Sequence, residues 1–386
     1  MSTSKRDDEL IPEAPEVLVI ETGLLGELLV ITPALRAAKK AWPGSKVTVV
    51  VSPGSAPVLV GNPNVDRLLP LSKRERSGLL GVMRLSSWIR AKRFDVALVF
   101  HTSFRSALSA FLGAVPVRAG LSCEGRGLLL THKVPRDRSA YEVDEHLRVL
   151  GLLGVESAGR ELELHITAEE RAEAEALVGD IWERPFVCLH PGASREIRRW
   201  PAEQFAELGR DLTGDPGVDV VFAFGPGESE LADRVERSYA SAGSAKRPRE
   251  SEPRLCYPST PRVLGALFER AAAVVTNNTG PMHVAAAVGA PGVFIHGPTP
   301  VRRWHPSGDR YVAVFAADVA CRPCDSPTCS AGSLLCMEAV SVERVREAVE
   351  RLLAVGGREG GSVSGAPDRR SDCRYEDGAD EGGGGQ

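Results

Sequence analysis

Short, largely apolar segments recur along this chain, and helical patterns separate them. Examples are residues 17–20, 47–51, 94–100 and 218–224. A strand that is apolar on both faces is typical of a parallel sheet covered by helices on both sides. The alternation of such strands with helices therefore predicts an α/β fold. Because the chain has 386 residues, two domains fit the usual size of a domain better than one.

The segment 272–296 is the most informative of these units. An apolar run leads into the turn TNNTGP, which an alanine-rich helix and a second strand follow. Thr279, or Asn278 beside it, is a natural N-cap, and Pro281 suits the first helical position. The backbone N–H groups and helix dipole at such a turn can bind an anion, most often phosphate. An ordinary βαβ unit has the same pattern, and His283 either faces the anion or is a half-buried structural histidine.

A glycine turn follows the first apolar run. Gly23 and Gly26 allow close approach to the backbone there, but their spacing is not the GxGxxG of dinucleotide-binding proteins. This difference argues against an NAD-dependent oxidoreductase. Glu27 stands directly after the turn, ahead of a helix that we predict over residues 28–41. Its carboxylate can act as a general base toward an alcohol, or it can simply stabilise the start of the helix.

Charged residues also follow two later strands. Arg195, Arg198 and Arg199 come after residues 186–190, and guanidinium groups bind phosphate oxygens in bidentate geometry. A solvated basic helix start is the alternative. Glu228, or Glu230 two positions on, comes after residues 218–224. Either carboxylate can accept hydrogen bonds from ribose hydroxyls, or can stabilise the first turn of a helix.

Four cysteines form a compact cluster near the end of the predicted second domain. Four thiolates suit a structural zinc ion or an iron–sulfur cluster, although this spacing is not that of a standard zinc finger. Reduced thiols are the alternative, and the eight cysteines of the chain, without an export signal, fit either state better than a disulfide framework. The cluster consists of Cys321, Cys324, Cys329 and Cys336.

The composition and charge of the chain exclude some classes of binding partner. The formal net charge of −4 argues against nucleic acid as a partner held by bulk electrostatics. No apolar run reaches the ~18 to 20 residues needed to span a bilayer, and the first residues are polar and acidic, unlike a signal peptide. We therefore expect a cytoplasmic protein, for which peripheral contact with a membrane surface stays open.

Several motifs converge on one family. The resemblance is strongest in the segment VVTNNTGPMHVAAAVGAPGVFIHGPT. It also includes the opening VLVIETGLLGELLVITPALRAAKKAWPGSKVTVVV and the segments GNPNVDRLLPL, FDVALVF, LHPGASREIRRWPAEQFAEL and FGPGESELA. They resemble the bacterial ADP-heptose:lipopolysaccharide heptosyltransferases, which form glycosyltransferase family 9. The resemblance covers roughly residues 16 to 350, and its most specific part is the block around TNNTGPMH.

This resemblance implies a GT-B fold, in which two Rossmann-like domains with parallel sheets face each other across a cleft. The N-terminal domain takes the sugar acceptor, and the C-terminal domain takes the nucleotide-sugar donor. The expected boundaries are 1–15 for a flexible arm, 16–165 for the acceptor domain, 166–184 for a linker helix, 185–340 for the donor domain, 341–355 for a last helix packing back toward the N-terminal domain, and 356–386 for a disordered tail.

The resemblance also implies the reaction and its residues. A sugar, a heptose or a related one, moves from an ADP-sugar to a lipid-linked glycan acceptor such as a lipopolysaccharide core, with inversion and with no cofactor required for catalysis. Glu27 takes the place of the catalytic aspartate, and Gly23 and Gly26 lie beside the acceptor and phosphate. The expected donor-binding residues are Ser194, Arg198, Glu228 (with Glu230 as the competing alignment), Asn278, Thr279, Gly280 and His283.

Some positions depart from the family pattern. Glu27 and Asn278 stand where the family usually has aspartates, Glu21 stands where it often has a basic residue, and Arg198 replaces a lysine. These changes keep a second hypothesis open, a nucleotide-sugar-binding protein of the same fold that has lost turnover.

Overall fold

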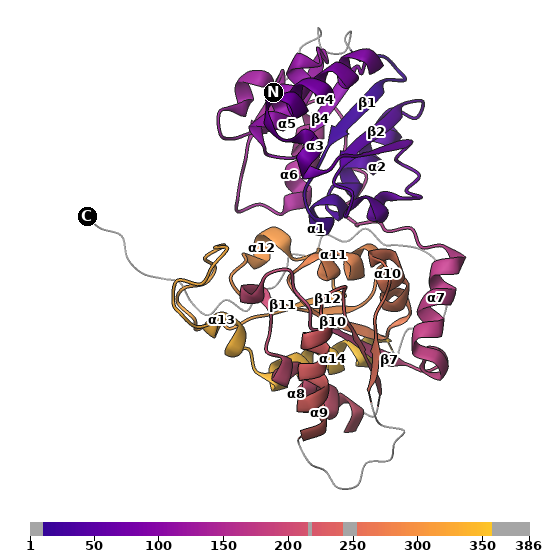
Figure 1. Ribbon diagram of the computed structural model, residues 1–386, viewed down its shortest axis with the longest axis vertical. Helices are drawn as coiled ribbons and strands as arrows, with labels where there is room; N and C mark the ends of the chain where they lie inside the picture. The colour runs from indigo at the N-terminus through magenta and orange to yellow at the C-terminus, as the bar shows by residue number, and fades with distance from the viewer. Residues whose placement is uncertain (1–10, 215–217, 242–252, 357–386) are drawn as a thin grey trace, which may run out of the picture.

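The computed structural model describes residues 11–214, 218–241 and 253–356. Two six-stranded sheets, each covered by helices, form two domains stacked along the long axis of the molecule (Figure 1). Every neighbouring pair of strands is parallel. The predicted α/β architecture with two facing Rossmann-like domains is confirmed.

The first sheet has the strand order β3-β2-β1-β4-β5-β6. Its central strand β1 is apolar and fully enclosed, as expected for a strand covered on both faces. The chain reverses its direction of winding between β1 and β4, and ligands bind at such a point, beyond the carboxyl ends of the strands. The strands are β1 (Glu16–Ile20), β2 (Lys46–Val51), β3 (Arg67–Pro70), β4 (Val96–Val99), β5 (Val117–Ser122) and β6 (His132–Pro135).

The second sheet repeats this topology with the order β12-β11-β10-β7-β8-β9. Its winding reverses between β7 and β10, so a second ligand-binding edge is expected there. The strands are β7 (Phe186–His190), β8 (Asp219–Ala223), β9 (Arg254–Cys256), β10 (Ala273–Asn277), β11 (Gly292–Ile295) and β12 (Tyr311–Val314).

Helices cover both faces of each sheet. Those of the first domain are α1 (Leu25–Leu29), α2 (Thr32–Ala41), α3 (Lys73–Arg76), α4 (Gly78–Lys92), α5 (Phe104–Leu112) and α6 (Glu142–Gly151), with the short 3-10 helices η1 (Ala56–Leu59) and η2 (Arg126–Leu129). The linker forms α7 (Ala168–Val178) and η3 (Gly179–Glu183). The second domain has η4 (Glu196–Arg198), α8 (Ala202–Gly214), α9 (Ser229–Ser241), α10 (Pro261–Arg270), α11 (Gly280–Ala287), α12 (Val301–Trp304), α13 (Leu335–Glu338) and α14 (Val342–Gly356).

The single helix predicted over residues 28–41 is wrong, because the chain forms two helices, α1 and α2. Pro33 stands in the first turn of α2, where its missing N–H costs nothing, whereas inside a continuous helix it would leave the carbonyl of Leu29 without its donor. The hydroxyl of Thr32 donates to that carbonyl instead, at 2.7 Å. The break leaves α1 as a separate short helix directly after the glycine turn.

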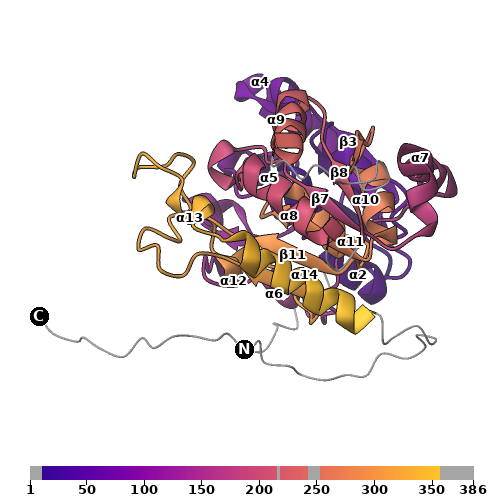
Figure 2. The same ribbon diagram turned by 90° about the horizontal axis from the view of Figure 1, so that it is seen from below.

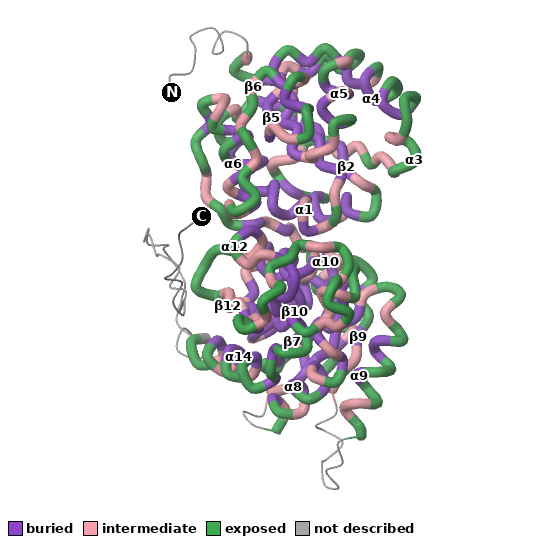
Figure 3. The backbone as a smooth tube through the Cα atoms, turned by 90° about the vertical axis from the view of Figure 1, so that its left-hand side faces the viewer, coloured by how far each residue is buried: buried purple, intermediate pink, exposed green. Residues whose placement is uncertain are grey.

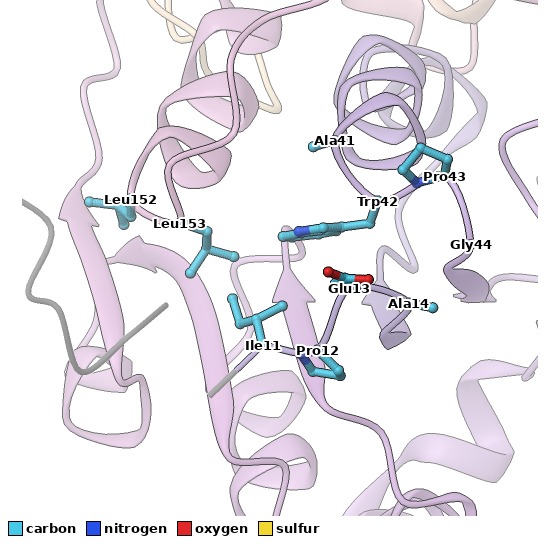
Figure 4. A pocket seen from close by; sticks show the side chains of 10 residues that line it. All are labelled: Ile11, Pro12, Glu13, Ala14, Ala41, Trp42, Pro43, Gly44, Leu152 and Leu153. Atoms are coloured by element: carbon cyan, nitrogen blue, oxygen red, sulfur yellow. The ribbon is translucent and has the colours of Figure 1, made fainter. Parts of the chain in front are cut away.

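The N-terminal segment from residue 11 onward is packed, although we predicted a loose arm as far as residue 15. The backbone N–H of Lys46 donates to the carbonyl of Pro15 at 3.1 Å. Figure 4 shows Ile11, Trp42 and Leu153 pointing into a cavity of about 610 Å³ beneath this segment. Ile11 packs against the apolar core and Pro15 is buried, while residues 12–14 are exposed. Residues 1–10 lie outside the described part of the chain.

The last helix also corrects an expectation. We predicted that residues 341–355 pack back toward the N-terminal domain, but α14 packs against α8 and the strands β10 to β12 (Figure 2). Val345 and Val349 continue the apolar core of the second domain. The indole N–H of Trp200 donates to the carbonyl of Val340 at 2.9 Å, which fixes the entry to the helix. The predicted disordered tail, from residue 357 on, lies outside the described residues.

The two domains touch through helices at the carboxyl ends of their sheets. Figure 3 shows the buried helix α1 facing α10 and α12 of the other domain, and α1 packs directly against α11. The N–H of Leu164 donates to the carbonyl of Ala287. The guanidinium of Arg303 donates to the carboxylate of Glu142 at 2.9 Å across the boundary. These contacts bring both ligand-binding edges to one place.

Candidate active site

A cleft of about 750 Å³ lies between the two domains. Its walls are the carboxyl ends of β1, β2, β7, β8 and β10 and the loops that follow them. Six of the predicted site residues line it: Gly23, Gly26, Ser194, Glu228, Thr279 and Gly280. The other four residues predicted for catalysis or donor binding, Glu27, Arg198, Asn278 and His283, are not among its lining residues.

Polar side chains that sequence reasoning did not single out also line the cleft: Thr22, Ser52, Ser55, Arg76, His190 and Thr260. Most lie at the carboxyl end of a strand, and that position was the available signal. Arg76 lies far from β1 in sequence, yet it donates to the hydroxyl of Thr22 at 2.7 Å. It therefore adds a positive charge to the side of the cleft that the N-terminal domain forms.

Glu27 lies in α1, with its carboxylate folded back over the glycine turn. It accepts a hydrogen bond from the N–H of Leu24 at 2.6 Å, as a glutamate near a helix start often does. A methyl group on Gly23 would lie 2.2 Å from an oxygen of Glu27 and 2.9 Å from an oxygen of Glu21. Gly23 is therefore the small residue that lets two carboxyl groups approach the same turn.

Glu21 is the second carboxyl group of this turn. Its side chain is 4% exposed and accepts from the N–H of Gly23 at 2.8 Å. Burial raises the pKa of Glu21 well above its ordinary value, and the negative charge of Glu27 raises it further. The raised pKa favours the neutral form of Glu21, which weakens the repulsion that two close carboxylates would have. Sequence reasoning saw Glu21 only as a departure from the family pattern, since burial is invisible in the sequence.

Arg198 faces this turn from the other domain, at the end of η4. Burial lowers the pKa of Arg198, while the negative charges of Asp325 and Glu27 act in the opposite direction. Its Nε is buried and has no hydrogen-bond partner among the described residues. The structure thus places Glu27 and Arg198 within electrostatic reach of each other, and a free donor on Arg198 suits an anionic ligand.

Glu228 joins the loops after β7 and β8. Its carboxylate accepts from the N–H of Gly225 at 2.7 Å. A methyl group on Gly192 would lie 2.3 Å from both of its carboxylate oxygens, so the two loops close around it. Glu230 is exposed on α9 and is not among the residues that line the cleft. The geometry therefore favours Glu228 over the competing alignment with Glu230.

The side chains of the turn TNNTGP point in two directions, some toward the cleft and others into the second domain. Asn277 accepts from the N–H of Trp200 at 2.9 Å and donates to the carbonyl of Pro191 at 2.8 Å, which ties the turn to the loop after β7. Thr279 is at the N-cap of α11 as predicted, although its hydroxyl makes no capping hydrogen bond. Asn278 points away from the cleft, toward His296. Among the predicted donor-binding residues of the turn, Asn278 therefore contacts His296 with its side chain, and donor binding by Asn278 stays a prediction.

His283 is buried where the two domains meet. A methyl group on Gly26 would lie 2.7 Å from the imidazole Cδ2, and the ring of Trp304 packs edge-on at 6.0 Å between centroids. Burial lowers the pKa of His283 to about 4, so the ring is neutral at pH 7. Gly26 and His283 thus form a close contact between α1 and α11.

The four clustered cysteines line one small cavity together with Ile197 and Pro298. Burial raises the pKa of Cys336, and the other three thiols raise it further. Nevertheless, across residues 11–214, 218–241 and 253–356 no three histidine, cysteine, aspartate or glutamate side chains are close enough to share a metal ion. The thiols therefore converge on one cavity without forming a closed ligand shell.

The described helices include none that is both long enough and apolar enough to cross a membrane.

Comparison with known proteins agrees with this architecture. The family model described as glycosyltransferase family 9 (heptosyltransferase) matches residues 82–335. Lipopolysaccharide heptosyltransferase 2 of Salmonella typhimurium is 28% identical over 296 residues, which cover 74% of this chain and 83% of that protein.

Solved structures show the same fold. A glycosyl transferase family 9 protein from Veillonella parvula has a TM-score of 0.76 and 25% identity, with 88% of this chain and 98% of that chain covered. The E. coli heptosyltransferase WaaC with ADP has a TM-score of 0.65 and 20% identity, with 87% and 99% covered. With the family model matched over most of its two domains, the chain belongs to glycosyltransferase family 9, the heptosyltransferases, and is a glycosyltransferase.

Proposed function

We propose that this protein transfers a heptose or a related sugar from an ADP-sugar to the core of a lipopolysaccharide or a similar lipid-linked glycan. The observation that carries the proposal is the interdomain cleft lined by Gly23, Glu228 and the start of α11 at Thr279 and Gly280. Beside it, Glu27 and Arg198 lie within electrostatic reach of each other. WaaC, which shares this fold, was solved with ADP and with ADP-2-deoxy-2-fluoro heptose. An ADP-sugar in the donor half of the cleft is consistent with both facts.

The proposed mechanism is a single displacement with inversion at the anomeric carbon. Glu27 takes the proton of the acceptor hydroxyl as that oxygen attacks. The free donor of Arg198 and the backbone N–H groups at Thr279 and Gly280 stabilise the charge that develops on the departing diphosphate. Glu228 binds the ribose hydroxyls. The step needs no metal, because these groups supply the positive charge.

Contact with a membrane is consistent with the surface of the acceptor domain. Leu79 and Leu80 on α4 are 74% and 72% exposed, and α4 packs beside α5, whose Phe104 is also exposed. Lys73 on the adjoining α3 adds positive charge. Apolar and basic side chains on one surface suit anionic lipid, so we propose peripheral binding at the inner face of the cytoplasmic membrane.

An assay with purified protein tests the proposed function. We expect ADP release when ADP-heptose and a lipopolysaccharide acceptor lacking heptose are both present, and a matching gain of one heptose in the mass of the acceptor. Omission of the acceptor is the control. Binding of ADP-heptose without ADP release would instead support the second candidate, a binding protein, for which Glu27 only stabilises a helix start through Leu24.

We propose further that the four-cysteine cluster holds a structural metal ion outside the catalytic step. Four thiols around one cavity are a donor set for zinc or iron, and the convergence of the four on that cavity supports the assignment. The loop would have to tighten to complete the ligand shell. Such an ion would fix the loop between β12 and α13, which carries the partner of Arg303, Asp325.

Metal analysis should find about one zinc or iron ion per chain. Cys324→Ser should lower that content and the Tm, while Cys123→Ser, outside the cluster, should change neither. Protein purified without chelators and free of both metals would contradict the assignment and identify the four residues as reduced thiols.

A further inference from the structure

Three side chains form a hydrogen-bonded chain behind the donor-facing turn. The amide nitrogen of Asn278 lies 2.6 Å from Nδ1 of His296. The Nε2 of His296 lies 3.1 Å from Nδ1 of His305. The Nε2 of His305 lies 3.3 Å from the carbonyl oxygen of Tyr311. The chain therefore joins the TNNTGP turn to the backbone of β12.

The carbonyl of Tyr311 fixes the direction of every hydrogen bond in this chain, because it can only accept. His305 must then carry its proton on Nε2, so its Nδ1 accepts from Nε2–H of His296. The Nδ1 of His296 is in turn unprotonated and accepts from the side-chain NH₂ of Asn278. Both rings are thus in the same neutral tautomer, and the amide of Asn278 has one orientation.

The surroundings favour the neutral form of both rings. Burial lowers the pKa of His296 well below its ordinary value, and His305, Arg322 and His283 lower it further. Burial lowers the pKa of His305 to about 4. Asn278 itself is 3% exposed. An amide, unlike a carboxylate, can donate a hydrogen bond to the unprotonated nitrogen of a neutral imidazole. Asn278 is therefore a suitable hydrogen-bond partner for a neutral His296.

We propose that Asn278, His296 and His305 are positioning residues, which hold the start of α11 where the donor diphosphate binds. Asn278 precedes Thr279, the N-cap of α11, and its own N–H donates to the carbonyl of Ile295 at 2.9 Å. Side chain and backbone together fix this residue to β11 and β12. The inference rests on the proposed function, because it names what supports the donor site. It also explains the asparagine at position 278 by its hydrogen bond to neutral His296, and not by a loss of activity.

Asn278→Asp provides the first test, since it restores the usual residue of the family. A carboxylate only accepts, so His296 would have to carry a proton on Nδ1, and the chain would reverse as far as His305. The Nε2 lone pair of His305 would then face the Tyr311 carbonyl unless the pair of rings took up one more proton. We expect the ADP affinity of this variant to depend on pH more strongly than that of the wild type, whose own pH dependence reflects protonation of the terminal phosphate of ADP at about pH 6. The charged or titratable groups facing the pair are His283 and Arg322.

Two variants of His296 separate the hydrogen bonds from simple packing. In His296→Gln the side chain can still accept from Asn278 and donate to His305, so ADP affinity should stay within about threefold. In His296→Phe both bonds are lost and the affinity should fall roughly tenfold. Circular dichroism checks that both variants fold. Equal ADP affinity in the two variants would overturn the positioning role.

Nitrogen NMR of the imidazole rings, recorded without ADP, tests the chain itself. We expect a proton on Nε2 and none on Nδ1 in both His296 and His305. A proton on Nδ1 of either ring, in protein that binds ADP, would overturn the hydrogen-bonded chain and leave the proposed function intact. A wild-type protein that does not bind ADP would overturn the proposed function, and the positioning role with it.

Discussion

Glu27→Gln should lower the rate of ADP release at least ~100-fold, since a general base typically contributes about 10²- to 10⁴-fold. The amide is close in shape to the carboxylate, and its oxygen can still accept from the N–H of Leu24, which now bonds to Glu27 at 2.6 Å. The start of α1 should therefore persist, and ADP should bind as it does to the wild type. The measurement is kcat with ADP-heptose and acceptor, beside the Kd for ADP.

Glu230→Gln is the matched control, because it makes the same chemical change at a residue that is exposed on α9, outside the cleft. Its kcat should equal that of the wild type. Glu27→Asp offers a graded comparison: the carboxylate is retained but withdrawn by one methylene, and misplacement by ~1 Å can cost about 100-fold. A Glu27→Gln variant with full activity would show that Glu27 only stabilises the helix start.

The elements of the fold were predictable because each depends on local pattern. Enclosed strands such as β1 and β7 leave continuous apolar runs in the sequence, and glycine or proline marks where they end. The turn before α11 also follows from local preference, since Thr279 and Pro281 suit the first positions of a helix. Two domains of equal topology then follow from the repetition of these units.

Packing partners and side-chain directions were not predictable in the same way. The apolar stripe of α14 shows that one face of the helix is buried, but it does not show which domain covers that face. In the structure α14 packs against the second domain. In the turn, adjacent residues point in opposite directions, so Thr279 lines the cleft while Asn278 faces His296. The sequence separates Asn278 from His296 by a helix and a strand, and only the parallel pairing of β10 with β11 brings them together.

Glu21 shows a third limit. As a lone substitution for a basic residue, it suggested lost function. The structure buries it against Gly23 and beside the charge of Glu27, and both burial and that charge raise the pKa of Glu21. The protonation state of a residue depends on burial and neighbours, neither of which a single sequence reveals.

Acid should unfold this protein between pH 6.5 and pH 4, because several histidines are buried in the neutral form. The pKa values of His101, His146, His283 and His305 are each lowered from 6.5 to about 4, first of all by burial. Between these two pH values the unfolded chain binds more protons than the folded one. The free energy of unfolding therefore falls as the pH falls through this window.

The expected size of the effect exceeds that of any single substitution. A shift of about 2.5 pKa units corresponds to ~3 kcal/mol for each histidine, and the stability of a whole domain is only about 5–15 kcal/mol. Glu21 acts in the opposite sense: its pKa is raised, so its contribution to stability grows as the pH falls toward its ordinary value. The stabilisation from one carboxyl group is smaller than the destabilisation from four imidazoles, so the free energy of unfolding falls overall as the pH falls.

Denaturant titrations at pH 8, 6, 5 and 4, followed by circular dichroism, measure this loss. His146→Gln should flatten the pH dependence by about one histidine's share, ~3 kcal/mol, because His146 lies fully enclosed against Phe100 with its Nδ1 unpartnered among the described residues. His165→Gln makes the same chemical change at a histidine whose side chain is 42% exposed, and serves as the comparison. A free energy of unfolding that stays constant from pH 7 to pH 4.5 would contradict the burial of neutral histidines, and with it the uncharged state of the imidazoles behind the proposed donor site.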